Sequence, residues 1–144
     1  MKKLPVGIQS FEKIQEEGYL YIDKTRYIWE LIDRGKYYFL SRPRRFGKSL
    51  LISTLRCLFE GRRELFKGLW IENHWDWDKK YPVVVIDFNV IPANTPEELL
   101  SAISENLREI SESYGIELSS SLLSQKFVEL ILQLREKFQV DVVI

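Results

Sequence analysis

The architecture of this chain is set by one run of residues, Tyr37-Tyr38-Phe39-Leu40-Ser41-Arg42-Pro43-Arg44-Arg45-Phe46-Gly47-Lys48-Ser49-Leu50-Leu51. A short apolar, β-prone segment leads into a basic loop, and the loop leads into a helix-type pattern. At the start of such a helix, backbone N–H groups and the positive end of the helix dipole favour negative charge. The run therefore predicts a site for a nucleoside triphosphate. Lys48 would reach the β- and γ-phosphates, and the Ser49 hydroxyl would ligate Mg²⁺.

The loop matches the phosphate-loop pattern Gly-x-x-x-x-Gly-Lys-Ser/Thr only in its second half. Arg42 stands where the pattern has its first glycine, and Pro43 stiffens a loop that is usually rich in glycine. The tripeptide Gly-Lys-Ser is a weak signal alone, but here it stands between a predicted strand and an amphipathic helix, as the motif requires. The alternative interpretation is a basic turn that caps a helix. We predict a variant Walker A loop that binds nucleotide through Arg42, Pro43, Arg44, Arg45, Phe46, Gly47, Lys48, Ser49 and Leu50.

Strand-like and helix-like patterns alternate along the chain. Residues 36–41, 82–88 and 140–144 have the composition of strands, and helices are predicted from about residue 24 to 34, after the loop, from residue 96 and from about residue 121. This alternation predicts an α/β protein with a three-layer, P-loop NTPase-like parallel sheet flanked by helices. A sheet that ends on a bare apolar strand leaves an unprotected edge, which indicates a truncated domain.

The composition limits the classes of function. Among the 144 residues, Lys+Arg and Asp+Glu both number 21, so a net charge of zero gives no overall attraction to nucleic acid or to an anionic membrane. Any role with nucleic acid must rest on a local patch. Cys57 is the single cysteine, which excludes an internal disulfide and suits a reducing cytosol. No apolar run reaches membrane-spanning length, so we expect a cytoplasmic protein without a membrane partner.

Residues outside the loop extend its motif. They are the run Leu4-Pro5-Val6-Gly7-Ile8-Gln9-Ser10-Phe11-Glu12, the run Tyr21-Ile22-Asp23-Lys24-Thr25, and segments within 58–69 and 81–88. Together with the loop they resemble the N-terminal part of the bacterial AAA-ATPase-like proteins, in which arginine at the position of Arg42 is usual. The resemblance implies ATP and Mg²⁺ as cofactors and an ATPase as the parent protein, with Lys48 as its catalytic residue.

The same resemblance implies a domain plan. Residues 1–144 would be the N-terminal part of an AAA-ATPase-like P-loop NTPase domain. Within it, residues 1–35 would form a helical segment and residues 36–144 a sheet core with the phosphate loop at 41–49. Members of the family often carry a PD-(D/E)XK nuclease-like domain towards the C-terminus, so nucleic acid is a partner implied for the parent protein. An oligomeric state of the protein is also compatible with this plan.

Hydrolysis of a nucleotide needs carboxylates near the phosphate loop, to hold Mg²⁺ and to orient water. Asp87 follows the apolar run 83–86 and fits the end of a metal-binding strand. Alternatively, residues 140–144 form that strand and its carboxylates lie beyond Ile144; the resemblance favours this second placement. Without the carboxylates the chain would bind nucleotide with no useful turnover, so enzyme activity stays open.

The basic loop has a second interpretation. Arginines 42, 44 and 45 could bind phosphates bidentately, form a salt bridge with a carboxylate, or contact nucleic acid. Their position directly before Gly-Lys-Ser favours nucleotide. The competing hypothesis is a non-enzymatic module whose loop Arg42–Arg45 meets nucleic acid or a partner protein.

Three features outside the loop also have two interpretations each. The segment around Phe11 and Tyr21 either wraps an adenine or packs as a helical lid, and Asp23 with Thr25 needs only helix capping to explain it. His74 is a catalytic base or, more simply, a packing residue among tryptophans. Cys57 is most simply a small core residue.

Overall fold

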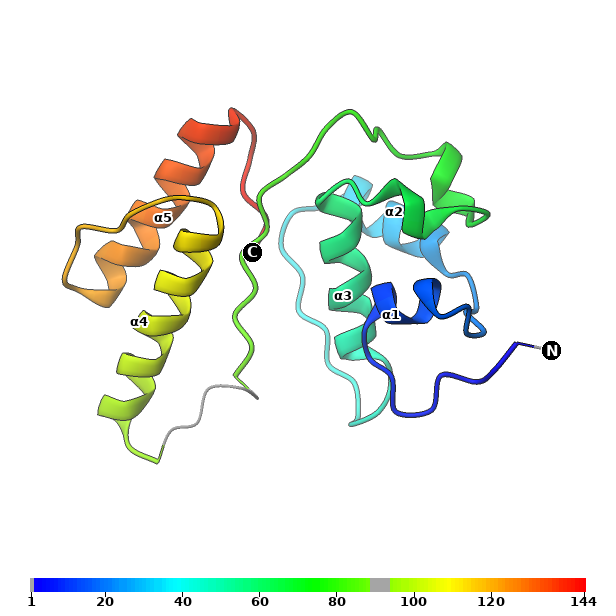
Figure 1. The fold of residues 1–144 in the computed structure, drawn as a ribbon, viewed down its shortest axis with the longest axis horizontal. Coiled ribbons are helices and arrows are strands. Elements are labelled where there is room, and N and C mark those ends of the chain that lie inside the picture. Colours follow the sequence, from blue (N-terminus) through cyan, green and yellow to red (C-terminus); the bar gives the residue numbers. More distant parts are fainter. Residues whose placement is uncertain (1, 89–93) are drawn as a thin grey trace. The chain divides into compact units, whose positions relative to one another are not determined.

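The structure, a computed structural model of the chain, describes residues 2–88 and 94–144 (Figure 1). Two compact units follow one another, Met1–Lys80 and Tyr81–Ile144. The regular elements in the described ranges are helices, and none of these helices combines the length and apolarity needed to cross a membrane. The first unit contains α1 (Phe11–Glu16), α2 (Thr25–Arg34), α3 (Lys48–Phe59) and the 3-10 helices η1 (Arg63–Phe66) and η2 (Trp70–Asn73). The second contains α4 (Pro96–Ser113) and α5 (Leu123–Phe138).

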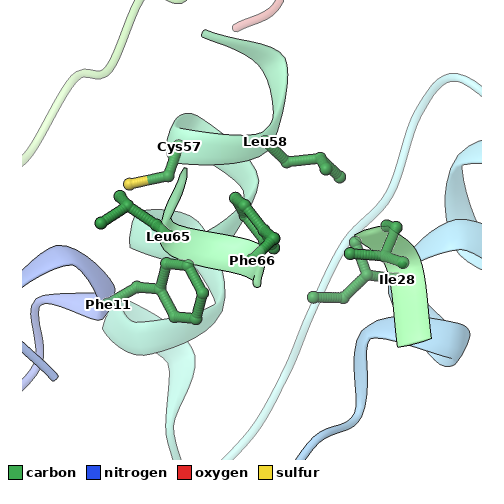
Figure 2. Close-up of a cluster of buried hydrophobic side chains, with 7 residues drawn as sticks. Phe11, Ile28, Cys57, Leu58, Leu65 and Phe66 are labelled. Atoms are coloured by element: carbon green, nitrogen blue, oxygen red, sulfur yellow. The ribbon is translucent and has the colours of Figure 1, made fainter. Parts of the chain in front are cut away.

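The core of the first unit is a cluster of apolar side chains from its helices. Its buried members are Phe11, Ile28, Cys57, Leu58, Leu65, Phe66 and Ile71 (Figure 2). The rings of Phe11 and Phe66 are fully buried with centroids 4.7 Å apart, and the Trp77 ring lies 5.3 Å from that of Phe66. Full burial of an aromatic side chain stabilises a fold by about 1.5–3 kcal/mol. These contacts therefore hold α1 and η1 together.

Helix α3 has the position that the sequence predicts for a helix after the loop. It follows Gly47, whose φ of 75° is left-handed, a conformation that glycine adopts without steric cost. Thr54, on the buried face, donates its hydroxyl to the carbonyl of Leu50 at 2.8 Å. The Phe11 N–H donates to the Ser53 hydroxyl at 2.9 Å, which fixes the start of α1 to the side of α3.

The second unit is built around α4 and α5, which pack against each other. The predicted helix from residue 96 is present as α4, and its start is capped in both directions: the Thr95 hydroxyl accepts from the Glu98 N–H at 3.2 Å, and the Glu98 carboxylate accepts from the N–H of Asn94, the residue before the N-cap, at 2.7 Å. Apolar side chains from both helices pack together in the core of this unit. Its buried core consists of Val84, Leu107, Ile116, Leu130 and Leu134.

The predicted three-layer α/β fold with a parallel sheet is wrong. Across residues 2–88 and 94–144 the chain forms no β-strand, and the segments expected to be strands are irregular backbone instead. One isolated parallel bridge joins Val83 to Val143. In it, the Val84 N–H donates to the Val143 carbonyl at 2.8 Å and the Val143 N–H donates to the Pro82 carbonyl at 3.0 Å.

The expected strands do not form because β-prone residues make a strand only when a neighbouring segment completes their hydrogen bonds. Pro82 has no N–H to donate, so the ladder cannot extend through it. Both polar groups of the Val83 backbone are occupied by Tyr114: the Val83 N–H donates to the tyrosine oxygen at 2.8 Å, and the Tyr114 hydroxyl donates to the Val83 carbonyl at 3.0 Å. Segment 36–41 has exposed side chains and forms no β-ladder with any other segment described in the structure.

Replacing Phe66 by alanine is expected to lower the free energy of unfolding of the first unit by about 3–5 kcal/mol, because it leaves a cavity between Phe11 and Trp77. All four tryptophans lie within residues 29–77, so tryptophan fluorescence during urea denaturation follows this unit. Tyr37→Ala is the matched control, since Tyr37 is 95% exposed and its removal should change stability little. Equal losses in the two variants would contradict the assigned core.

Candidate phosphate-binding site

The N-terminus of α3 is open to a ligand. Its N-cap residue, Gly47, offers no side chain to the first turn, and that turn contains no acidic residue. The first helical hydrogen bond runs from the Leu51 N–H to the Gly47 carbonyl, at 2.9 Å. The backbone N–H groups before Leu51 in the turn therefore have no carbonyl of the helix to bind. They leave a partial positive charge at the surface, where an anion is favoured.

The loop before α3 is a tight turn with two left-handed residues. Arg45 has a φ of 66° and Gly47 a φ of 75°. Glycine takes this conformation readily, but for arginine it is uncommon and costs energy that surrounding contacts must offset. Left-handed residues in a turn direct successive N–H groups towards one side, and such concave arrangements bind anions. The backbone of the loop thus reinforces the field at the helix end.

The Lys48 side chain links the end of the loop to its start by two hydrogen bonds. Its Nζ donates to the Arg42 carbonyl at 2.6 Å and to the Pro43 carbonyl at 2.8 Å. The ammonium of the first helical residue is thereby held against the first residues of the loop. This contact was not foreseen from the sequence, where Lys48 has only the role of a phosphate ligand. An ammonium has three donors, so a phosphate can bind it by sharing or replacing these carbonyls.

The other predicted site residues are exposed, except Leu50, which packs against the core cluster. Arg42, Arg44 and Arg45 are exposed and form no ion pair with a carboxylate in the described part of the chain. The salt bridge considered as one interpretation of these arginines is therefore not present there. Pro43, Phe46, Gly47 and Ser49 are also exposed, and Leu50 is half-buried against the core cluster. Leu50 thus fixes the helix that carries the loop.

The carboxylate suggested for the metal, Asp87, is not part of the unit that carries the loop. Asp87 is exposed and belongs to the second unit, after the segment 82–86. Across residues 2–88 and 94–144, no three His, Cys, Asp or Glu side chains come together as a metal-binding group. A metal ion in the loop would rely on the Ser49 hydroxyl, phosphate oxygens and water.

The Asp23-Lys24-Thr25 motif serves to join α2 to η2. One carboxylate oxygen of Asp23 accepts from the N–H and the hydroxyl of Thr25, at 2.8 and 2.7 Å. The other accepts from the Trp70 N–H at 2.7 Å, and the Thr25 oxygen accepts from the Ile71 N–H at 3.2 Å. Thr25 is fully buried. Local capping was predicted for this pair, but its link to Trp70, distant in the sequence, was not.

His74 and Cys57 have structural environments. The imidazole of His74 stacks on the Trp70 ring with centroids 3.7 Å apart and planes 10° apart, and its Nδ1 lies 2.7 Å from the Trp70 carbonyl. Cys57 is buried in the core, and burial, with smaller effects from nearby charges, raises the pKa of its thiol to about 11. A thiol with this pKa is a poor nucleophile at neutral pH.

Comparison with known proteins places the chain in a family. A family model described as Predicted AAA-ATPase matches residues 5–144. The chain belongs to this family. It is also similar to a protein of Azotobacter chroococcum mcd 1 named "Uncharacterized protein in vnfD 5'region", with 44% identity over 133 residues. The aligned part is 92% of this chain and 26% of that protein, so this AAA-ATPase family member spans about a quarter of its relative's length. No solved structure matches the chain.

Family membership confirms the resemblance that the loop and its flanking motifs indicate. It does not by itself assign a role to any residue, so the nucleotide contacts of the loop and the nuclease-like C-terminal domain stay predictions.

Asp23 should make the stability of the first unit depend on pH. Partial burial is the largest influence and raises the pKa of Asp23, but the hydrogen bonds from Trp70 and Thr25 together lower it below its usual value of 3.8. The stabilisation is therefore complete above the unfolded-state pKa and is lost as pH falls below it through the folded-state pKa. Asp23→Asn should weaken this acid dependence in fluorescence-monitored urea denaturation, whereas Asp33→Asn, an exposed position on α2, should retain it. Identical pH profiles for Asp23→Asn and the unmodified chain would contradict the assignment.

Proposed function

We propose that the loop 41–49 and the N-terminus of α3 bind the polyphosphate of ATP together with Mg²⁺. The observation that carries the proposal is the open helix end: no side chain caps it, no acidic residue lies in its first turn, and a lysine ammonium lies across its loop. Each of these features lowers the free energy of an anion at this place. The family description, Predicted AAA-ATPase, agrees with a nucleotide as that anion.

Lys48 is assigned to the β- and γ-phosphates. In the structure its ammonium donates to two neutral carbonyls of the loop. A phosphate oxygen is a stronger acceptor because it is charged, and hydrogen bonds between charged groups are about twice as strong as neutral ones. The exchange of a carbonyl for a phosphate therefore favours binding. The carbonyl contacts also keep the ammonium near the site before the nucleotide arrives.

Ser49 is assigned to the metal ion. Its hydroxyl lies in the first turn of α3 and is exposed. A serine oxygen is a hard ligand of the kind that Mg²⁺ prefers, and Mg²⁺ usually keeps several waters and phosphate oxygens besides its protein ligands. When bound, the ion neutralises part of the phosphate charge. The exposed Arg42, Arg44 and Arg45 guanidiniums supply further positive charge around the loop.

Binding, rather than hydrolysis, is the function proposed for the residues of this chain. Across residues 2–88 and 94–144 no three His, Cys, Asp or Glu side chains form a metal-binding group, and hydrolysis requires carboxylates to hold Mg²⁺ and to orient the attacking water. ATPase activity is proposed only for a longer parent protein, with its acidic residues either at Asp87 or beyond Ile144.

Titration with a fluorescent ATP analogue tests the site. Lys48→Ala should weaken binding about tenfold to hundredfold, the range expected for a lost hydrogen bond between charged groups. Ser49→Ala should weaken binding in Mg²⁺ and change it little in the presence of a chelator, because its oxygen acts through the metal. Lys36→Ala, an exposed lysine just before the loop, is the matched control and should bind as the unmodified chain does.

Affinity that is unchanged in Lys48→Ala and in Ser49→Ala would rule out this site. Equal weakening in Lys36→Ala would show that only diffuse charge attracts the nucleotide.

A further inference from the structure

Ser49 and Ser53 share one face of α3. They stand four residues apart in the helix, so their side chains lie one above the other, with Cβ atoms about 5–6 Å apart. Ser49 is exposed in the first turn, whereas Ser53 is half-buried. A contact that fixes the Ser53 side chain therefore also fixes the direction in which Ser49 points.

Ser53 is bound from outside its own helix. Its hydroxyl oxygen accepts the Phe11 N–H at 2.9 Å, across 42 positions of the sequence. Phe11 is the first residue of α1, so this N–H has no carbonyl of α1 to bind. The Phe11 side chain is fully buried in the core cluster. The N–H therefore stays beside α3, and Ser53 supplies its acceptor.

The hydroxyl of the next residue, Thr54, has a different use. It donates to the Leu50 carbonyl at 2.8 Å, and this bond lies within α3. A bond inside a helix does not fix how the helix is rotated about its axis. The apolar contacts of Leu50 hold α3 to the core, but such contacts are not directional. The bond at Ser53 fixes the rotation, because hydrogen bonds are directional and its donor belongs to α1.

Helix α1 is itself held by residues outside α3. The Phe11 ring packs on that of Phe66 in η1, with centroids 4.7 Å apart. The Glu12 carboxylate lies 2.8 Å from the Arg62 guanidinium, just before η1. Both partners of this ion pair are partly exposed, so the ring contact contributes most of the attachment. The donor that binds Ser53 is thus fixed independently of the phosphate loop.

We propose that Ser53 is a positioning residue for Ser49, the residue assigned to the metal ion. The inference rests on the proposed function, in which Mg²⁺ binds the Ser49 hydroxyl. Mg²⁺ requires near-ideal octahedral geometry with ligand oxygens at about 2.0–2.1 Å, so a small rotation of α3 weakens its contact with Ser49. The Lys48 ammonium has a flexible stem and can follow a phosphate through the same rotation. The Ser53 bond therefore governs the contribution of Mg²⁺ to the affinity and leaves the metal-free affinity unchanged.

Titration with the fluorescent ATP analogue, in Mg²⁺ and in a chelator, tests the proposal, because the ratio of the two affinities measures the contribution of the metal. Ser53→Ala should lower this ratio about threefold to tenfold, the size expected for one lost hydrogen bond. Ser53→Thr keeps the hydroxyl and should restore the ratio. When Ser49→Ala is already present, adding Ser53→Ala should not change the ratio further, because Ser53 acts through Ser49.

Ser10→Ala is the matched control. Ser10 is the N-cap of α1, and its hydroxyl accepts the Lys13 N–H at 3.2 Å. The substitution removes this cap but keeps the bond between Phe11 and Ser53, so the ratio should match that of the unmodified chain. If urea denaturation shows that Ser53→Ala does not fold, Ser53→Cys takes its place and should give the same loss, because its sulfur is only a weak acceptor.

The outcomes separate this inference from the proposed function. A full contribution of Mg²⁺ in Ser53→Ala, together with its loss in Ser49→Ala, would overturn the inference and leave the nucleotide site intact. Equal loss in Ser10→Ala, a further loss in the double variant, or a weaker affinity in chelator would also overturn it, because each would show that Ser53 only supports the fold. Absence of binding, or of any contribution of Mg²⁺, in the unmodified chain would overturn the proposed function and this inference together.

Discussion

The site depends on how α3 is held: one face of the helix lies in the core while its N-terminus stays open at the surface. Cys57 and Leu58 bury the far half of the helix, and Leu50 packs near its start. The Phe11 N–H and the Ser53 hydroxyl join α1 to its side. A helix fixed along its length cannot move its N-terminus away from a ligand. The direction of the helix dipole and of the first N–H groups is therefore set by packing far from the loop.

The Lys48 side chain orders the loop by binding two backbone carbonyls of the loop itself. The end of α3 gathers positive charge and N–H groups that have no helical partner. The Lys48 ammonium binds the carbonyls of Arg42 and Pro43, which orders the start of the loop. The arginines have no such contact with a carboxylate in the described residues, and they remain available to an anion. The same loop can thus be ordered before the proposed binding of a polyphosphate.

Local features of the fold were predictable from the sequence, and the pairing of distant segments was not. The helix that begins at Pro96 after its N-cap Thr95 and the helix after Gly47 depend on neighbouring residues, and both are present. The sheet depends on partners for the segments 36–41, 82–88 and 140–144, and it is absent from the described residues apart from the bridge between Val83 and Val143. Pro82 limits the pairing with Val143, and Tyr114 occupies the opposite edge of the segment at Val83; no local preference in segment 82–88 reveals that a distant tyrosine will occupy its backbone.

The same distinction applies to the site. The loop residues are predicted by a motif that specifies them by spacing; family membership agrees with the motif, and the roles of these residues stay predictions. The contacts of Lys48 with the loop and the link from Asp23 to Trp70 were not recognisable. They follow from which segments pack together and which are left without a neighbour.

The most direct measurement of the central claim is a titration of the ¹⁵N-labelled chain with inorganic pyrophosphate, followed by the amide resonances in a two-dimensional NMR spectrum. If the open end of α3 binds polyphosphate, the amides of Gly47, Lys48, Ser49 and Leu50 should shift most, and those of α5 should shift little. Absence of shifts at these four residues, or larger shifts elsewhere in the chain, would contradict the account.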